Sequence, residues 1–141
     1  MPKISNFIYC AKAIEQNEQN GIITALGIMN TIFPDYIPGN YSFSILCGIT
    51  GLTEGFHTIQ IDFVDPKDHV LVHLEGVVSA THDSKIDIPE EYSLLTIKAE
   101  LCNVVFQECG IYKSVVRVDG KDLGSFEIYA HEKILPSEKS R

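Results

Sequence analysis

Apolar and polar residues alternate with a period of two along most of the chain, which is the pattern of strands with one buried face. The clearest case covers Gly55–Val78, where two alternating runs, FHTIQIDFV and HVLVHLEGVV, flank an Asp-Pro-Lys-Asp sequence at 65–68. Asp at the first position and Pro at the second are typical of a type I turn. The segment therefore predicts a β-hairpin.

A four-residue loop at 65–68 would fix the register of this hairpin. It predicts the following opposite pairs: Val64 with His69, Phe63 with Val70, Ile61 with Val72, and Ile59 with Leu74. The last three pairs are apolar on both strands. The turn and the alternation therefore agree on which face is buried.

A second hairpin is predicted over Gly110–Lys133. Asp119-Gly120 is the two-residue signature of a type I′ turn, which needs positive φ at both positions. Apolar residues alternate on both sides of this turn, except that Leu123 is out of step with the residues that follow it. Gly124 comes next, so we predict a β-bulge at this point.

The remaining strands are predicted from shorter runs, at 6–10, 21–32 with a bend at Gly27, 41–50 and 93–106. The polar stretch at 11–20 and the proline-containing stretches at 33–40 and 81–92 are predicted to be loops, and 134–141 a frayed tail. About eight strands with regular turns predict an all-β chain. We expect a single-domain antiparallel Greek-key β-sandwich over residues 1–141, in immunoglobulin-like or jelly-roll order.

Composition narrows the classes of function. The chain has 141 residues and a formal net charge of −8, from 19 acidic residues against 11 lysines and arginines. No lysine or arginine cluster is present, which disfavours nucleic acid and anionic membranes as partners. No secretory signal and no apolar run long enough to span a membrane is present, so we expect a cytoplasmic protein.

Three segments together resemble an uncharacterised family of small bacterial β-sandwich proteins, a domain of unknown function. They are NFIYC…NGIITALGIMNTIFPDYIPGNYSF, GFHTIQIDFVDPKDHVL and CGIYKSVVRVDGKDLGSFEI. The shared features are a first strand ending in Cys10, a Gly-x-His strand at 55–57, and a closing hairpin with Gly-x-Tyr at 110–112 and Asp119-Gly120. A vaguer likeness links this hairpin to immunoglobulin-like and fibronectin-type modules. The resemblance implies a sandwich fold and no assigned activity.

Histidine and cysteine offer little sign of a reactive centre. His69 and His73 share the outer face of one predicted strand, but about 13 Å separates them, which is too far for one metal ion. The predicted register places Gln60 opposite His73. The four cysteines form no C-x-x-C pair and are expected to be buried thiols. Cys109 and His131 would approach each other only if the fold joined their strand ends.

Acidic turns are the second possibility for a ligand site. Asp65 and Asp68 bracket one turn, and Asp119 and Asp122 lie at another. Loop carboxylates at one end of a sandwich can bind calcium. Asp is also a common turn residue, and no segment has the spacing of an EF-hand loop. We therefore expect turn stabilisation at these four positions and no cofactor.

The sequence has no catalytic motif, so we expect a protein that is not an enzyme. The leading hypothesis is a protein-interaction or assembly module, with self-association as a homodimer included. Its expected contact residues are Leu46 and Leu71, which fall on outer strand faces, and Tyr36 and Ile37 in a loop. The alternative is a lectin-like or C2-like sandwich that binds a ligand through its acidic loops, with or without calcium.

Overall fold

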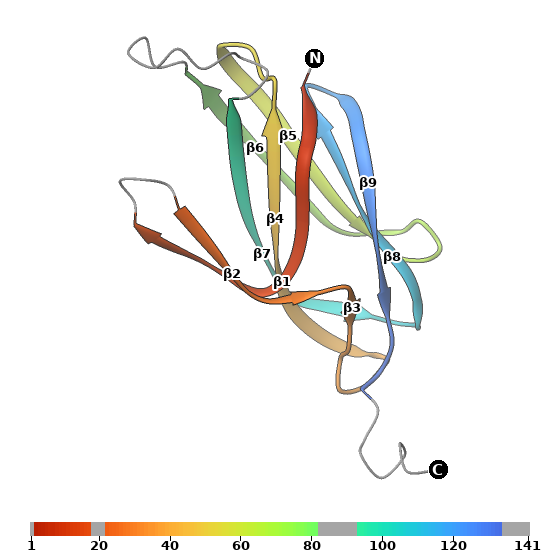
Figure 1. Ribbon diagram of the computed structural model, residues 1–141. Helices are drawn as coiled ribbons and strands as arrows, with labels where there is room; N and C mark the ends of the chain where they lie inside the picture. The colour runs from red at the N-terminus through yellow and green to blue at the C-terminus, as the bar shows by residue number, and fades with distance from the viewer. Residues whose placement is uncertain (1, 18–21, 82–92, 134–141) are drawn as a thin grey trace.

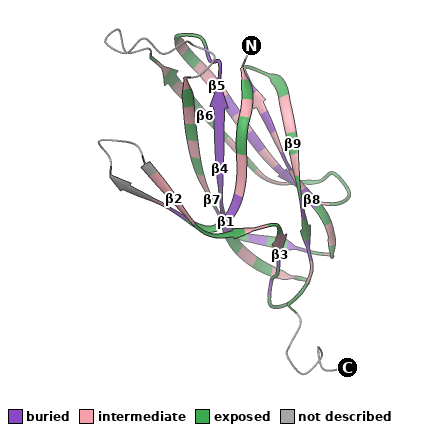
Figure 2. Cartoon of the chain, viewed as in Figure 1, coloured by how far each residue is buried: buried purple, intermediate pink, exposed green. Residues whose placement is uncertain are grey.

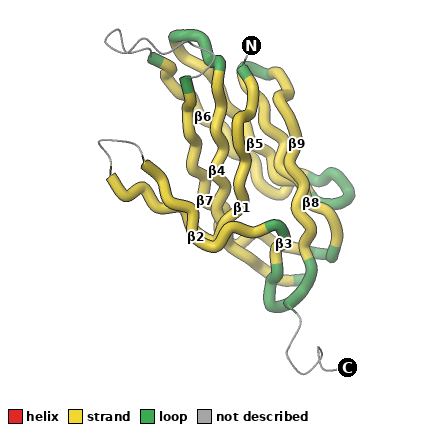
Figure 3. The backbone as a smooth tube through the Cα atoms, in the orientation of Figure 1, coloured by secondary structure: helices red, strands yellow, loops and turns green. Residues whose placement is uncertain are grey.

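The computed structural model describes residues 2–17, 22–81 and 93–133, and all regular structure in these ranges is β-strand (Figure 3). Nine strands follow one another along the chain: β1 (Lys3–Asn17), β2 (Ile22–Met29), β3 (Thr31–Ile32), β4 (Gly39–Thr50), β5 (Gly55–Val64), β6 (Val70–Ala80), β7 (Leu94–Phe106), β8 (Gly110–Val118) and β9 (Lys121–Ala130). The predicted tail at 134–141 and nearly all of the predicted loop at 81–92 lie outside the described residues.

The strands form two sheets that pack face to face (Figure 1). One sheet has four strands in the order β2-β1-β4-β7, and the other has five in the order β3-β9-β8-β5-β6. All pairs are antiparallel except the short contact between β3 and β9. The predicted all-β sandwich is confirmed. The ninth strand arises because the predicted strand at 21–32 is two strands, which belong to different sheets.

The first strand is much longer than its apolar core at 6–10 suggests. The expected loop at 11–20 is wrong for its described part, because β1 continues to Asn17 and pairs with β2. Residues 11–17 of β1 and strand β2 together form an arm that projects away from the rest of β1 (Figure 1). Gly27 lies at this bend with φ of 67°, and a Cβ there would be 2.9 Å from that of Ala11. The bend therefore requires glycine at position 27.

The β5–β6 hairpin forms, but its predicted register is wrong by two residues. Phe63 lies opposite Val72 instead of Val70, and Ile61 lies opposite Leu74 instead of Val72. The loop is shorter than expected, because the Asp65 amide donates to the His69 carbonyl oxygen. The rest of the shift comes from a bulge at Leu71, the extra residue between the pairs Val64–Val70 and Phe63–Val72.

This bulge overturns the expectation that Leu71 lies on an outer face. A shift of two residues keeps Val72 and Leu74 on the buried face, as predicted. The extra residue at the bulge leaves the alternation, and Leu71 packs against the larger core cluster beside Val72. Leu71 is therefore half-buried and is no free contact residue.

The closing hairpin of β8 and β9 is confirmed in detail. Asp119 and Gly120 both have positive φ, at 51° and 81°, as a type I′ turn requires. The extra residue in the ladder is Leu123, beside Gly124, where the bulge was predicted. The Tyr112 hydroxyl donates to the carbonyl oxygen of Glu108 at 2.6 Å, which ties the loop before β8 to the core.

The buried aromatic side chains of the described residues lie in one half of the space between the sheets, and the other half holds buried aliphatic side chains. Figure 2 shows buried residues along β4, inside the four-stranded sheet. The aromatic half includes Phe43, Phe63, Phe106 and Tyr112, all buried. The rings of Phe106 and Tyr112 have centroids 4.8 Å apart. These contacts join β4 and β7 of one sheet to β5 and β8 of the other.

A third, smaller cluster lies on the outer face of the four-stranded sheet. Leu46 was expected to be exposed there, and this expectation is wrong: only 6% of the residue is exposed. Cys10 and Ala13 of β1 are buried with it, and Ile23 of β2 packs against it. The arm therefore covers the outer face of β4, which alternation along β4 alone could not indicate.

A histidine–aspartate pair closes the end of the sandwich near the Asp119-Gly120 turn. The Nδ1 atom of His57 lies 2.7 Å from Oδ2 of Asp119, and its Nε2 lies 2.6 Å from the carbonyl oxygen of Thr53. Both ring nitrogens face acceptors, so the imidazolium form satisfies both. The hydrogen bond with Asp119 raises the pKa of His57 above 6.5, and the same bond lowers the pKa of Asp119 below 3.8.

These shifts predict a pH-dependent contribution to stability. The contribution of His57 is complete below its ordinary pKa of 6.5 and is lost as pH rises through the raised value. The contribution of Asp119 is complete above 3.8 and is lost as pH falls through the lowered value. The pair is therefore at full strength between these limits, and Asp119→Asn should lower the melting temperature more at pH 6 than at pH 9.

The matched control is Asp122→Asn. The Asp122 carboxylate accepts a hydrogen bond from the Gly124 amide, and no histidine lies in contact with it among the described residues. Its effect on melting temperature should be the same at both pH values. An equal loss at pH 6 and pH 9 for Asp119→Asn would show that the pair carries no charge-dependent stability.

Candidate functional site

A cleft of about 400 Å³ lies between β1 and β9. These strands belong to different sheets and lie side by side (Figure 1). From Lys3 to Ile8, β1 pairs only with β4, because its pairing with β2 begins at Tyr9. Before Tyr129, β9 pairs only with β8. Two strand edges without a strand partner among the described residues therefore border the cleft.

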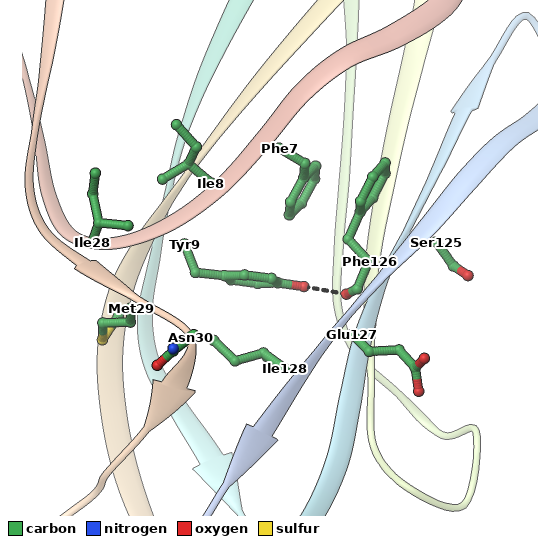
Figure 4. A pocket seen from close by; sticks show the side chains of 10 residues that line it. All are labelled: Phe7, Ile8, Tyr9, Ile28, Met29, Asn30, Ser125, Phe126, Glu127 and Ile128. Atoms are coloured by element: carbon green, nitrogen blue, oxygen red, sulfur yellow. Dashed lines mark hydrogen bonds between the residues drawn. The ribbon is translucent and has the colours of Figure 1, made fainter.

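Apolar side chains dominate the lining, and a few polar groups stand at its border (Figure 4). The lining residues are Phe7, Ile8, Tyr9, Ile28, Met29, Asn30, Ser125, Phe126, Glu127 and Ile128. Ile28 near the end of β2 is 69% exposed, so its side chain is available to a bound molecule. Such a surface favours burial of apolar groups.

Tyr9 joins the two sheets at the inner end of the cleft. Its hydroxyl donates to the carbonyl oxygen of Phe126 at 2.6 Å and lies 2.7 Å from the hydroxyl of Ser114. The single Tyr9 proton is used in the first bond, so Ser114 is the donor in the second. Burial raises the pKa of Tyr9 well above its ordinary value, so the hydroxyl stays protonated.

The rings of Phe7 and Phe126 form the outer part of the same wall. Their centroids are 4.4 Å apart and the ring planes are parallel within 1° (Figure 4). Both side chains are half-buried and pack against both core clusters. The stack spans the gap between β1 and β9 and leaves apolar surface facing the cleft.

The arrangement is suited to binding rather than to acid–base chemistry. Among the lining residues, Tyr9 and Glu127 are the only ones that titrate. The Tyr9 hydroxyl is held in two hydrogen bonds and kept neutral by burial. A general acid–base pair needs two groups poised near the pH of the reaction, and this lining does not provide one.

The structure separates the two acidic turns. Ile59 pairs with Val118 and Val64 with Lys113, so the Asp65–Asp68 turn and the Asp119–Asp122 turn lie at opposite ends of the sheet. The four carboxylates therefore cannot share an ion. Each also has a partner within the protein: Asp65 accepts from two amides of its own turn, and Asp68 lies 3.3 Å from the Lys113 Nζ.

The surroundings of His73 differ from the prediction. Because the register is shifted, Asp62 and not Gln60 lies opposite His73. The Asp62 carboxylate is bonded to Nδ1 of His73 and, at 3.0 Å, to Arg117. Within the described ranges, no three His, Cys, Asp or Glu side chains are grouped as a metal site would require.

The cysteines divide into two kinds. Cys10 and Cys47 are buried as predicted, and burial raises the pKa of Cys47 to about 12. Cys102 and Cys109 are exposed, so the general expectation of buried thiols is wrong for these two residues, although the position of Cys109 at a turn is consistent with its exposure. Cys109 and His131 come to the same end of the sheet, because Gly110 pairs with Ala130. Nδ1 of His131, however, is bonded to the carbonyl oxygen of Glu132.

The two loop residues expected to make contacts differ in exposure. Tyr36 is 76% exposed, in agreement with the prediction, whereas Ile37 is half-buried and packs against the aromatic core. Sequence reasoning missed Phe7, Tyr9 and Phe126, which build the cleft. Phe7 and Tyr9 stand two residues apart in the first apolar run, a sign of one aromatic strand face, but the run did not reveal what they face.

No helix in the described part of the chain is long and apolar enough to cross a membrane. In a comparison with family models, residues 6–131 match the DUF6941 model, which is described as a family of unknown function. No curated protein matches the chain.

Among solved structures, parts of three bacterial proteins are similar to this chain. A glycosyl hydrolase family 2 member from Bacteroides cellulosilyticus is 14% identical, with a TM-score of 0.47, over 66% of this chain and 13% of that one. A putative β-galactosidase from Bacteroides fragilis is 12% identical, with a TM-score of 0.47, over 67% and 14%. A β-glucosidase from Listeria innocua in complex with glucose is 16% identical, with a TM-score of 0.44, over 72% and 15%. The chain spans a small fraction of each, and no activity is inferred from them.

The link through Tyr9 predicts a loss of stability on removal of one hydroxyl. Tyr9→Phe leaves the buried Ser114 hydroxyl without its partner, which should lower the free energy of unfolding by about 1–3 kcal/mol in urea denaturation. Tyr41→Phe is the matched control, because the one hydrogen bond of the Tyr41 hydroxyl within the described residues is to the Met29 sulfur, a weak acceptor, at 3.5 Å. Equal losses in the two variants would argue against the link.

Proposed function

The chain belongs to the DUF6941 family of unknown function, and we propose that it is a non-enzymatic protein-binding module whose β1–β9 cleft takes an extended segment of a partner protein. The observation that carries this proposal is the position of the cleft. An apolar hollow of about 400 Å³ lies between two strand edges that have no strand partner among the described residues.

Strand edges favour a polypeptide over a small molecule as the occupant. An edge presents backbone N–H and C=O groups that an added strand can pair with, while alternate side chains of that strand enter a neighbouring pocket. Here Phe7, Ile28 and Phe126 would receive the apolar side chains. The net charge of −8 and Glu127 at the cleft favour a segment that carries lysine or arginine beside its apolar residues.

The strand order supports the same interpretation. Apart from the arm strand β2 and the short β3, the orders β1-β4-β7 and β9-β8-β5-β6 correspond to those of an immunoglobulin-like Greek-key sandwich. The bond from Tyr112 to the backbone four residues earlier resembles the tyrosine corner of such domains. We infer by analogy of fold an immunoglobulin-like module, since this fold commonly serves recognition.

The proposal predicts that one substitution in the cleft strongly weakens partner binding. Ile28→Glu places a charge on the most exposed apolar residue of the lining and should weaken capture of the partner at least about tenfold. The immobilised protein would be exposed to lysate of the host cell, and bound proteins would be quantified for the wild type and for the variant.

The matched control is Val77→Glu. Val77 lies on β6 and is 67% exposed, close to the value for Ile28, and it does not line the cleft. A photo-cross-linking residue at position 28 should label an extended segment of the partner, and the same residue at position 77 should not. A partner captured equally by all three proteins would place the binding surface elsewhere.

A further inference from the structure

The four-stranded sheet ends at β7, which pairs with β4 and with no other strand among the described residues. An edge of this kind is a template for pairing with a strand of another chain, and proteins usually protect it with charges or bulges. One bulge is present near Asn103, where φ is 53°. Before it, from Leu94 to Leu101, the ladder with β4 is regular.

On this regular stretch, exposed polar side chains alternate with half-buried apolar side chains from residue 96 to residue 100. Thr96, Lys98 and Glu100 are exposed on the outer face, while Ile97 and Ala99 are half-buried on the inner face. A positive and a negative charge therefore stand two residues apart on one face, with Ala99 between them. A strand with this pattern is complementary to its own antiparallel copy.

We propose that β7 pairs in antiparallel fashion with β7 of a second copy of this chain, about a twofold axis at Ala99. A twofold axis perpendicular to the sheet keeps the outer faces of both copies on the same side. In this register Lys98 of each copy lies opposite Glu100 of the other. The interface therefore holds two equivalent ion pairs, and the two four-stranded sheets become one continuous sheet.

Neighbouring registers that keep the faces aligned lack this complementarity. An axis at Lys98 places two lysines opposite each other, and an axis at Glu100 places two glutamates opposite each other. An axis at Ile97 sets Lys98 against Thr96 and Glu100 against Leu94. Like charges directly opposite are unfavourable, so the register at Ala99 is selected by charge.

The same pairing would cover a second opening of the sandwich. A cleft of about 290 Å³ lies between β6 and β7, on the side away from the β1–β9 cleft. Half-buried apolar residues line it, among them Leu74 and Val78 of β6 and Ile97 of β7. A second β7 beside the first would bring its half-buried inner-face residues, Ile97 and Ala99, towards this opening.

The β6 edge is a weaker candidate for the same role. Its polar residues are already bound within the chain, because His73 is bonded to Asp62 and Glu75 accepts from Gln60 at 2.5 Å. Its ladder is also interrupted by the bulge at Leu71. The β7 edge therefore combines an open ladder with charges that select a second copy.

Sedimentation equilibrium of charge variants tests the proposal. The wild type should show a dimer that dissociates on dilution. Lys98→Glu and Glu100→Lys should each weaken the dimer about tenfold or more, because each sets like charges opposite each other in both pairs. An equimolar mixture of the two single variants should form a heterodimer, and the double variant Lys98→Glu, Glu100→Lys should recover the homodimer.

Each outcome of this experiment either supports or contradicts the proposed register. Recovery in the mixture supports the register, since a chain with two acidic residues then faces a chain with two basic ones. A wild type that stays monomeric at high concentration overturns the proposal. A dimer that the single variants leave unchanged also overturns it. The substituted side chains are exposed, so unchanged melting temperatures would show that the monomers fold normally.

A disulfide provides a measurement independent of charge. In the proposed register Thr96 lies opposite Cys102 of the second copy, and Cys102 is a free, exposed cysteine. Thr96→Cys should therefore form a covalent dimer under mild oxidation. Leu94→Cys is the control, because position 94 lies two residues farther along, beyond the reach of a disulfide. Equal cross-linking of both variants, or of neither, would contradict the register.

Discussion

Among the described residues, the Tyr9 hydroxyl makes the polar side-chain link between the two sheets on the β1–β9 side of the sandwich. In the described part of the chain, neither β1 nor β9 has a strand partner there, so the distance between the sheets depends on side chains. The buried hydroxyls of Tyr9 and Ser114 satisfy each other, and a carbonyl of β9 accepts the remaining proton. An unpaired hydroxyl in this place would be costly, so the link fixes one geometry. The walls of the cleft beside it are therefore held in place by contacts within the chain itself.

The opposite side of the sandwich meets the same constraint differently. There the edges of β6 and β7 face each other across an opening lined by aliphatic side chains. Aliphatic contacts there are non-directional, unlike the hydrogen bonds of Tyr9. The two openings therefore differ in chemistry: one has an aromatic wall with polar groups at its border, and the other has a charged strand edge beside aliphatic side chains.

Periodicity predicted the sandwich and most buried faces, because it depends only on which side chains avoid water. The Asp-Gly dipeptide predicted the turn at 119–120, and the break in alternation beside Gly124 predicted the bulge at Leu123, because local chemistry decides the backbone at both places. Periodicity failed where one residue outside the alternation changed the register, as Leu71 does. It also failed for Leu46, which lies on the outer face of β4 but is covered by the arm. Tyr9 and Ser114 are 105 residues apart in the chain, and no local pattern joins them.

The residues that carry the family resemblance have structural roles, and this bears on where function lies. His57 and Asp119 bind each other and close one end of the sandwich, Tyr112 anchors a loop, and Cys10 is buried beneath the arm. Side chains used in this way are not available to a ligand. A function shared through the fold would then be carried by surfaces that the fold positions, and strand edges are the surfaces it leaves without strand partners among the described residues. Recognition through backbone pairing needs a shaped edge with neighbouring apolar surface more than it needs a particular motif, so the proposed binding surface would leave no motif in the sequence.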